Sequence, residues 1–236
     1  MRVELYGDDI GAVEYISHMG DDLSVVNAAR VSFGASRDEL KPKDVKLIKY
    51  LMEHNHTSPF EHCTVTMRFT VPLFIRSQHH RHRTWAYNEI SRRYTSIDMS
   101  FYEPCEFRSQ HKSNRQASTE ELINPDIAKH NSDLKLCPTP SYLASTAVSA
   151  HNRKSLELYN SLIDSGICRE QARGVLPQSL YTQYYGTVNL HNLLKFITLR
   201  VHEGAQWEIQ KVAYACMEIA EKLFPESVKA YKEKFK

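Results

Sequence analysis

Apolar and polar residues alternate without a break in the stretch CTVTMRFTV, which runs from Cys63 to Val71. This period of two, in a stretch rich in β-branched residues, is typical of a half-buried β-strand. Helical patterns flank it on both sides. Apolar residues recur at helical spacing over Pro42–Met52. A second helix is expected over about Pro72–Arg81, because proline is well tolerated at the first helical position.

The rest of the chain is predicted to be mainly helical. A short helix is expected over Leu23–Val31, with Asp22 as its N-cap. Helical spacing also marks the last third of the chain: Ser155–Ile163, Arg169–Leu176, Leu190–Val201, Ala205–Leu223 and a terminal stretch from Pro225. The polar segment from about 106 to 140 contains Pro125, Pro138 and Pro140, so we expect a surface excursion that is partly helical at most.

Composition describes a sizeable globular domain. The 236 residues are 42% hydrophobic and 25% charged, and neither a repeat nor a Gly/Ser-rich linker divides them, so a single domain of mixed α and β elements over residues 1–236 is predicted. Thirty basic and 28 acidic residues leave a net charge of +2, which gives no general attraction to nucleic acid or anionic membranes.

The sequence offers no membrane or secretion signal. Its longest apolar run, Val212–Met217, is far shorter than the roughly 20 residues that span a bilayer. The N-terminus has acidic residues and no apolar core of a signal peptide. We therefore expect a cytoplasmic protein without a membrane partner.

The five cysteines are widely spread and contain no C-x-x-C pair, which argues against a disulfide framework or a zinc ribbon. Histidines instead occur in two groups, His54, His56 and His62, then His79, His80 and His82. Imidazole is a common metal ligand, but neither group is followed by a carboxylate–histidine set with metal-binding spacing. No metal site is predicted, and these histidines are expected to be hydrogen-bonding partners or ligand contacts.

One segment, Arg76–Arg93, is locally basic. It holds five arginines and a single acid, Glu89, and aromatic residues are interleaved with the arginines: Trp85, Tyr87 and Tyr94. Guanidinium forks bind phosphate and carbonyl oxygens, and aromatic faces can stack on a ring, so the pattern suits a nucleotide or phosphorylated ligand. Two alternatives stay open: a solvated basic helix end whose rings pack in the core, and a module that binds single-stranded nucleic acid.

The same segment resembles a known family. Arg81-His82-Arg83, seven further residues and Ser91 match the R-H-R-x7-S signature of flavin-dependent thymidylate synthases. Further stretches resemble the family in the same order along the chain: His56–His62, Glu170–Pro177, Thr187–Asn189 through Leu199–Arg200, and Ala205–Ile209. The resemblance covers most of the chain and is weak in the first thirty residues and over about 106–140.

The resemblance implies an α/β (α+β) fold with a central, mainly antiparallel sheet flanked by helices. It also implies an enzyme that methylates dUMP reductively to dTMP. In this family 5,10-methylenetetrahydrofolate supplies the carbon, FAD carries the hydride and NADPH reduces the flavin. Family members are homotetramers whose sites combine residues from several subunits, and no nucleic acid partner is implied.

The resemblance also assigns roles to residues. Arg200 is expected to contact the uracil edge and to act catalytically. Positions that match dUMP contacts are Gln78, Arg81, Glu89, Ser91, Arg92, Arg93, Arg173 and Arg200. Positions that match FAD contacts are Ser58, Arg81, His82, Arg83, Glu89, Asn189, His191 and Lys195.

Two positions depart from the family pattern. Lys195 stands where a small amide side chain is expected against the flavin, and Gly204 stands where some relatives have a histidine. A local expectation concerns Glu170, which lies three residues before Arg173 and is predicted to orient it on one helix face.

Overall fold

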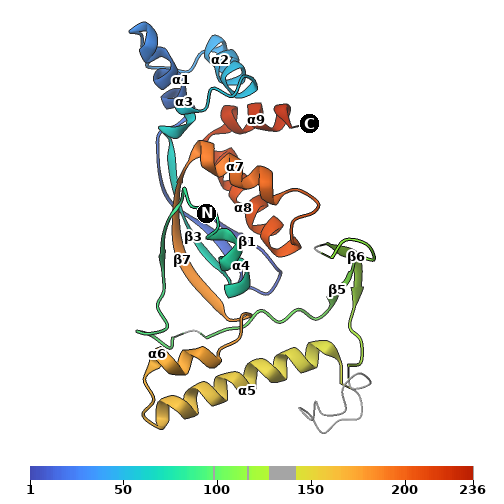
Figure 1. Cartoon of the computed structure of the whole chain (residues 1–236). Coiled ribbons are helices and arrows are strands. Elements are labelled where there is room, and N and C mark those ends of the chain that lie inside the picture. Colours follow the sequence, from blue (N-terminus) through green and yellow to red (C-terminus); the bar gives the residue numbers. More distant parts are fainter. Residues whose placement is uncertain (98, 116, 128–141, 236) are drawn as a thin grey trace. The chain divides into compact units, whose positions relative to one another are not determined.

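A computed structural model describes residues 1–97, 99–115, 117–127 and 142–235 of the chain (Figure 1). Its internal contacts form two compact units, each built from segments that are separated in sequence. The first unit comprises Met1–Thr70, Ser77–Glu89 and Gln183–Lys236, and the second comprises Val71–Arg76 and Ile90–Thr182. The predicted single domain over residues 1–236 stays a prediction.

The first unit contains a five-stranded sheet in the order β1-β2-β3-β7-β4. The strand pairs β1/β2, β2/β3 and β4/β7 are antiparallel, which confirms the predicted mixed fold with an antiparallel sheet. The strands are β1 (Arg2–Glu4), β2 (Ala12–Met19), β3 (Thr64–Pro72), β4 (Ala86–Glu89) and β7 (Tyr181–Asn189). The ends of β3 and β7 belong to the second unit.

Helices make up the rest of the regular structure of the first unit. They are α1 (Asp22–Arg30), the 3-10 turn η1 (Val31–Phe33), α2 (Pro42–Glu53), α3 (Ser58–Glu61), α7 (Leu190–Arg200), α8 (Trp207–Leu223) and α9 (Pro225–Lys234). Helix α8 packs on β2 and beside α7, and α9 packs on α2 (Figure 1). Helix α4 (Leu73–His79) begins in the second unit and ends in the first.

The predicted strand around Cys63 is confirmed as β3. Val65, Met67 and Phe69 are at most 1% exposed, while the residues between them are half-buried, as the alternation requires. The apolar stripe of α8 is buried in the same way, from Ile209 to Ile219. Burial of these two stripes places the sheet and α8 around one apolar core.

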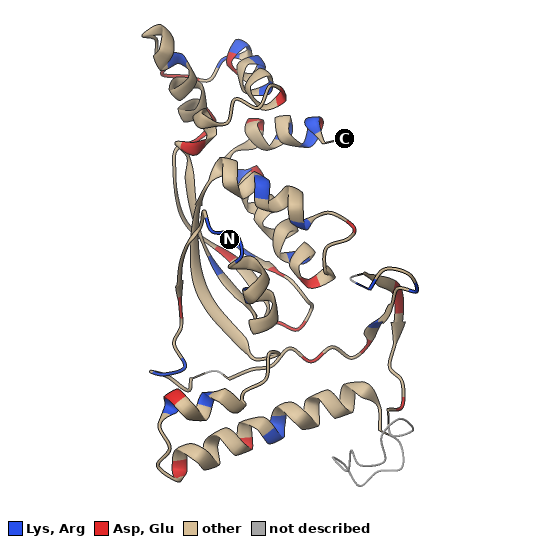
Figure 2. Ribbon diagram, in the orientation of Figure 1, with Lys and Arg blue, Asp and Glu red and all other residues tan. Residues whose placement is uncertain are grey.

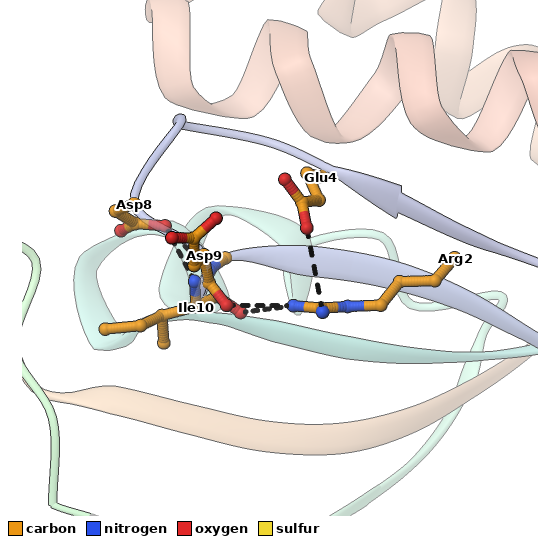
Figure 3. A network of polar contacts seen from close by, with 6 residues as sticks. Arg2, Glu4, Asp8, Asp9 and Ile10 are labelled. Carbon is orange, nitrogen blue, oxygen red and sulfur yellow. Dashed lines mark hydrogen bonds and ion pairs between the residues drawn. The ribbon is translucent and has the colours of Figure 1, made fainter.

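The turn between β1 and β2 is stabilised by its own polar side chains (Figure 3). Asp8 Oδ1 accepts hydrogen bonds from the backbone N–H groups of Ile10 and Gly11. The Arg2 guanidinium donates to the carbonyl oxygens of Asp9 and Ile10. Asp9 has a φ of 61°, a left-handed conformation that aspartate tolerates better than most residues. The hairpin therefore needs little core packing at its tip.

The predicted N-cap of α1 is wrong by one residue. Asp21, not Asp22, caps the helix by accepting from Ser24 N at 2.8 Å. Asp22 is 4% exposed, and its carboxylate accepts from the backbone N–H groups of Glu226 and Ser227 and from the Ser227 hydroxyl. These amides belong to the first turn of α9, so a side chain of the first helix caps the last one.

The second unit is built around helix α5 (Ala144–Asp164), which begins earlier than the predicted Ser155. Next to it lie α6 (Arg169–Ala172) and the 3-10 turn η3 (Arg173–Val175), in place of one continuous helix to Leu176. Tyr159 of α5 is 1% exposed and its hydroxyl lies 3.0 Å from Ser96 Oγ. Among the described residues, the apolar face of α5 is short of large side chains, because alanine occupies positions 147 and 150.

The polar excursion differs from its prediction. Over its described residues it forms a hairpin, β5 (Phe107–Gln110) and β6 (Ser118–Ile123), where at most partial helix was expected. Pro138 and Pro140 lie outside the described residues. Strand β7 is not among the predicted elements either, although Thr182, Tyr184, Gly186 and Val188 are buried at alternate positions.

Replacing Asp22 with Ala should lower the free energy of unfolding by about 3 kcal/mol, because it leaves the first-turn amides of α9 buried without an acceptor. Asp21→Ala is the matched control and should cost about 1 kcal/mol, the usual cost of an N-cap. Urea denaturation of both variants and the wild type measures the difference. Equal losses of unfolding free energy in the two variants would show that the Asp22 cap of α9 stabilises the protein no more than an ordinary N-cap does.

Candidate active site

The R-H-R triplet lies in a tight loop between α4 and β4, in the first unit. His82 N donates to the carbonyl oxygen of His79 at 3.0 Å. The Tyr87 hydroxyl donates to the carbonyl oxygens of His79 and His82, at 2.9 and 3.2 Å. The loop is thus held by its backbone carbonyls, and the side chains of Arg81 and Arg83 are left exposed.

An aromatic cluster lies beneath this loop. His79 is fully buried and its ring lies 4.5 to 4.7 Å from the rings of Phe69, Trp85 and Phe196. His79 Nδ1 is 2.7 Å from the Tyr184 hydroxyl. Burial, followed by the charges of neighbouring His82, His80 and Arg200, lowers the pKa of His79 well below its ordinary value. The ring is therefore neutral and behaves as part of the core.

Trp85 belongs to the same cluster and is 5% exposed. Its ring is parallel to that of Tyr87, at a centroid distance of 6.1 Å. A buried ring has no free face on which a base could stack. Of the interpretations that the sequence leaves open, packing of the ring in the core is therefore confirmed for Trp85. Tyr94 does not pack in the core, because it is 79% exposed.

Arg200, near the end of α7, meets the R-H-R loop. Its Nε donates to His82 Nε2 at 3.1 Å and its Nη2 donates to the Gln78 carbonyl oxygen at 3.4 Å. Burial, and then the charges of Arg200 and Lys195, lower the pKa of His82 to about 4. The imidazole is neutral at pH 7 and can accept this hydrogen bond. The structure thus brings together Gln78, His82 and Arg200, three predicted site residues.

A groove opens beside α7 in the first unit, with a volume of about 270 Å³. Its walls come from α2, α3, α7 and α9 and are mostly apolar, with polar side chains of His56, His191 and Lys195 among them. His191 and Lys195 are two of the predicted FAD contacts. Flat apolar walls suit a ring system, and the lysine suits a phosphate.

The other predicted FAD contacts come from several elements of the first unit. Ser58 is the exposed first residue of α3, directly after Thr57, which lines the groove. Asn189 is the N-cap of α7, and its Oδ1 accepts from Asn192 N at 2.9 Å. Glu89 ends β4 opposite Tyr184. The amide of Asn189 therefore already has a structural task, which the motif does not reveal.

The remaining predicted dUMP contacts lie in the second unit. Ser91 Oγ accepts from Arg93 N at 3.3 Å. Arg92 is half-buried and donates to the carbonyl oxygens of Ile97 and Tyr181. Arg93 is exposed and forms an ion pair with Glu170 at 3.2 Å. Arg92 is thus engaged with the backbone, and Arg93 and Arg173 are the exposed guanidinium groups of this set.

The predicted pair of Glu170 with Arg173 is not formed in the described structure. Helix α6 ends at Ala172, and Arg173 begins a 3-10 turn, so the two residues do not share one helix. Glu170 reaches Arg93 instead. The sequence cannot reveal this partner, because the two residues are far apart along the chain.

Other polar residues of the first unit serve the fold. His54 and His56 stack on Tyr50, with centroid distances of 4.1 and 5.9 Å. Among the described residues, no group of three or more His, Cys, Asp or Glu side chains is placed to hold a metal ion. Within the same part of the chain no helix is both long and apolar enough to cross a membrane. Helices α2 and α9 carry acidic and basic residues together (Figure 2).

Comparison with known proteins points in one direction. A family model described as thymidylate synthase complementing protein matches residues 14–226. A flavin-dependent thymidylate synthase of Thermus thermophilus is 39% identical over 225 residues, which cover 95% of this chain and 77% of that protein. One of Thermotoga neapolitana is 38% identical over 224 residues, 94% of this chain and 91% of that protein.

A solved structure is similar over nearly the whole chain. It is the crystal structure of a UMP/dUMP methylase PolB from Streptomyces cacaoi bound with 5-Br dUMP. The TM-score is 0.77 at 32% sequence identity, and the match covers 98% of this chain and 97% of that chain. The chain therefore shares its fold with this solved methylase.

The low pKa of His82 predicts a pH dependence of stability. Above the ordinary histidine pKa of 6.5 the ring is neutral in both states. As the pH falls from 6.5 to about 4, the unfolded chain binds a proton that the folded protein does not, so the free energy of unfolding decreases. His82→Gln should remove about one proton from this uptake. Urea denaturation between about pH 4 and pH 7 measures this. If the free energy of unfolding depends on pH in the same way in wild type and variant, the low pKa of His82 is contradicted.

Proposed function

This chain belongs to the family of flavin-dependent thymidylate synthases, and we propose that it uses 5,10-methylenetetrahydrofolate as carbon donor and NADPH as reductant. It is a flavoenzyme that methylates dUMP to dTMP. The observation that carries its chemistry is the hydrogen bond from Arg200 to a neutral His82, beside Gln78. A cytoplasmic location is part of the proposal, as the sequence predicts.

Arg200 is the proposed activating residue for the pyrimidine. Uracil C5 is a poor nucleophile until electron density moves into the ring, and a fixed cation at the uracil edge favours the enolate-like form. Arg200 is half-buried, and burial lowers its pKa, yet a guanidinium stays charged in proteins. Two protein acceptors orient it, His82 Nε2 and the Gln78 carbonyl. Because His82 is neutral, the group that accepts the Arg200 hydrogen bond does not repel the guanidinium charge.

The residues around the groove fit a flavin dinucleotide. FAD, when bound, supplies the redox chemistry of the reaction. The apolar walls suit a flat ring system, and we propose that Ser58, His191 and Lys195 hold the polar parts of the cofactor, with Arg81, His82, Arg83 and Glu89 of the loop region. At about 270 Å³ the groove lies near the low end of the range for small-molecule sites. It suits one portion of the dinucleotide.

The small groove supports a shared site. We propose that the protein is a homotetramer, and that further walls of each site come from another subunit, as in the family that the motif indicates. Ser91, Arg92, Arg93 and Arg173 are proposed to contribute the phosphate contacts, and Gln78 and Arg81 are proposed as further contacts to dUMP. Exposure of Arg93 and Arg173 leaves their guanidinium groups accessible to a nucleotide phosphate.

The purified protein should carry a flavin absorption spectrum and should convert dUMP to dTMP when methylenetetrahydrofolate and NADPH are both present. The flavin spectrum should change on addition of dUMP, because the proposed site places the nucleotide against the cofactor. Omission of the folate or of the reductant is the control and should stop dTMP formation. A folded protein that takes up no FAD would overturn the proposal.

Arg200→Ala should reduce dTMP formation at least about 100-fold, the scale found for removing one donor that stabilises developing charge. Flavin content should change little, since the proposed role of Arg200 is at the uracil edge. Arg153→Ala is the matched control, because Arg153 is an exposed arginine of α5 that pairs with Glu157. Turnover close to wild type in Arg200→Ala would exclude the catalytic role.

A further inference from the structure

The segment Ala205–Ile209 matches the family, yet the proposed reaction gives its polar residues no task. Gln206 is the N-cap of α8, but its side chain makes no capping hydrogen bond. Its Oε1 instead accepts a hydrogen bond from Gln78 Nε2, and its Nε2 donates to Glu208 Oε2 at 2.9 Å. A predicted dUMP contact is thus connected to a carboxylate through one intervening amide.

The direction of this chain of hydrogen bonds follows from chemistry. A carboxylate only accepts, so the side of the Gln206 amide that faces Glu208 must be its NH₂ group. The oxygen of Gln206 therefore faces Gln78, and Gln78 must present its own NH₂ group in return. Among the described residues, no donor pairs with Gln78 Oε1. The acceptor end of the Gln78 amide is thus left for a ligand.

Glu208 is a suitable anchor for this arrangement. It is 4% exposed and lies in the first turn of α8. The start of the helix is held by Tyr6, whose hydroxyl donates to the Glu208 carbonyl oxygen at 3.3 Å and whose ring lies 6.1 Å from that of Trp207. A buried side chain on a fixed helix end has few alternative positions. The Glu208 carboxylate can therefore determine which end of the exposed Gln206 amide faces it.

We propose that Gln206 and Glu208 are positioning residues, which fix the amide of Gln78 with its oxygen toward the bound nucleotide. The inference rests on the proposed dUMP site. If the amide were reversed, Gln78 would offer two N–H donors and no acceptor. The oxygen selects a hydrogen-bond donor of the nucleotide, and dUMP has two uncharged ones: the N3–H of uracil and the 3′-hydroxyl of the sugar.

Glu208→Gln tests the polarity with almost no change of shape. The new amide can donate or accept, so it no longer dictates which way Gln206 and Gln78 turn. Titration calorimetry of FAD-loaded protein should show about a tenfold weaker Kd for dUMP, the effect of losing one oriented hydrogen bond. Glu218→Gln is the matched control, the same substitution at an exposed position of α8 that pairs with Lys222. It should leave the Kd unchanged.

A swap provides the decisive comparison. In the double variant Gln206→Glu with Glu208→Gln, the carboxylate at position 206 accepts from both neighbouring amides. Gln78 is then forced to present its NH₂ group again, so the Kd for dUMP should return to within about twofold of wild type. A merely structural role for Glu208 gives no reason for a second substitution to restore binding.

The donor group is identified with 2′,3′-dideoxyuridine monophosphate, which keeps N3–H and lacks the 3′-hydroxyl. If the 3′-hydroxyl is the partner, Glu208→Gln should cost no further affinity for this analogue. If N3–H is the partner, the same tenfold loss should appear with both nucleotides. A loss of affinity unrelated to either donor would also appear with both nucleotides, and restoration of binding in the double variant separates the N3–H contact from such a loss.

Failure of the inference is distinct from failure of the proposed function. Wild-type protein that binds neither FAD nor dUMP would overturn the function itself. Wild-type binding with Glu208→Gln equal to Glu218→Gln, or with a double variant no tighter than the single one, would overturn the positioning role. If Glu208→Gln has a much lower Tm, Gln206→Met at the exposed position replaces it and should weaken dUMP binding without changing the Tm.

Discussion

Burial of the His79 side chain among aromatic rings is the constraint on which the candidate site depends. The ring contacts Phe69 of β3, Tyr184 of β7 and Phe196 of α7. Its backbone carbonyl accepts hydrogen bonds from His82 of the R-H-R loop and from Tyr87 of β4. One residue thus connects the sheet, the helix that carries Arg200 and the loop that carries His82. Because protein interiors are close-packed, movement of any of these elements would disturb the other two.

The same cluster explains why two histidines of the loop region are neutral. Burial removes water from both rings, and the nearby guanidinium opposes a second positive charge. A neutral His82 offers a lone pair to Arg200, whereas a protonated ring would repel it. The low dielectric of the aromatic cluster is therefore what makes a histidine an acceptor for an arginine, at a pH where a solvent-exposed imidazole would be partly charged.

Much of this arrangement is predictable from sequence, for physical reasons that differ between residues. The alternation from Cys63 to Val71 predicts β3, and helical spacing predicts α7 and α8, because periodicity records one buried face. The R-H-R-x7-S match selects Arg81 and His82 through resemblance, and the family stretch that ends at Arg200 selects that arginine. Other parts of the structure leave a weaker signal in the sequence. Strand β7 carries the same alternation, but its buried positions include Gly186, where a Cβ would come within 2.9 Å of Phe69 and 3.1 Å of Trp85. A buried glycine weakens the apolar pattern by which strands are identified. Contacts between distant residues, such as Arg93 with Glu170, leave no periodic signal at all.

The carboxylate of Asp22 also has a consequence for biosynthesis. Its donors, Glu226 and Ser227, are made more than two hundred positions later. The sheet likewise needs β7 to join β3 to β4. A nascent chain therefore cannot complete its first unit until the ribosome has translated Ser227. Until then the Asp22 carboxylate lacks its donors, and the earlier apolar strands belong to a partly folded chain. Such chains are expected to need protection from aggregation late in translation rather than early.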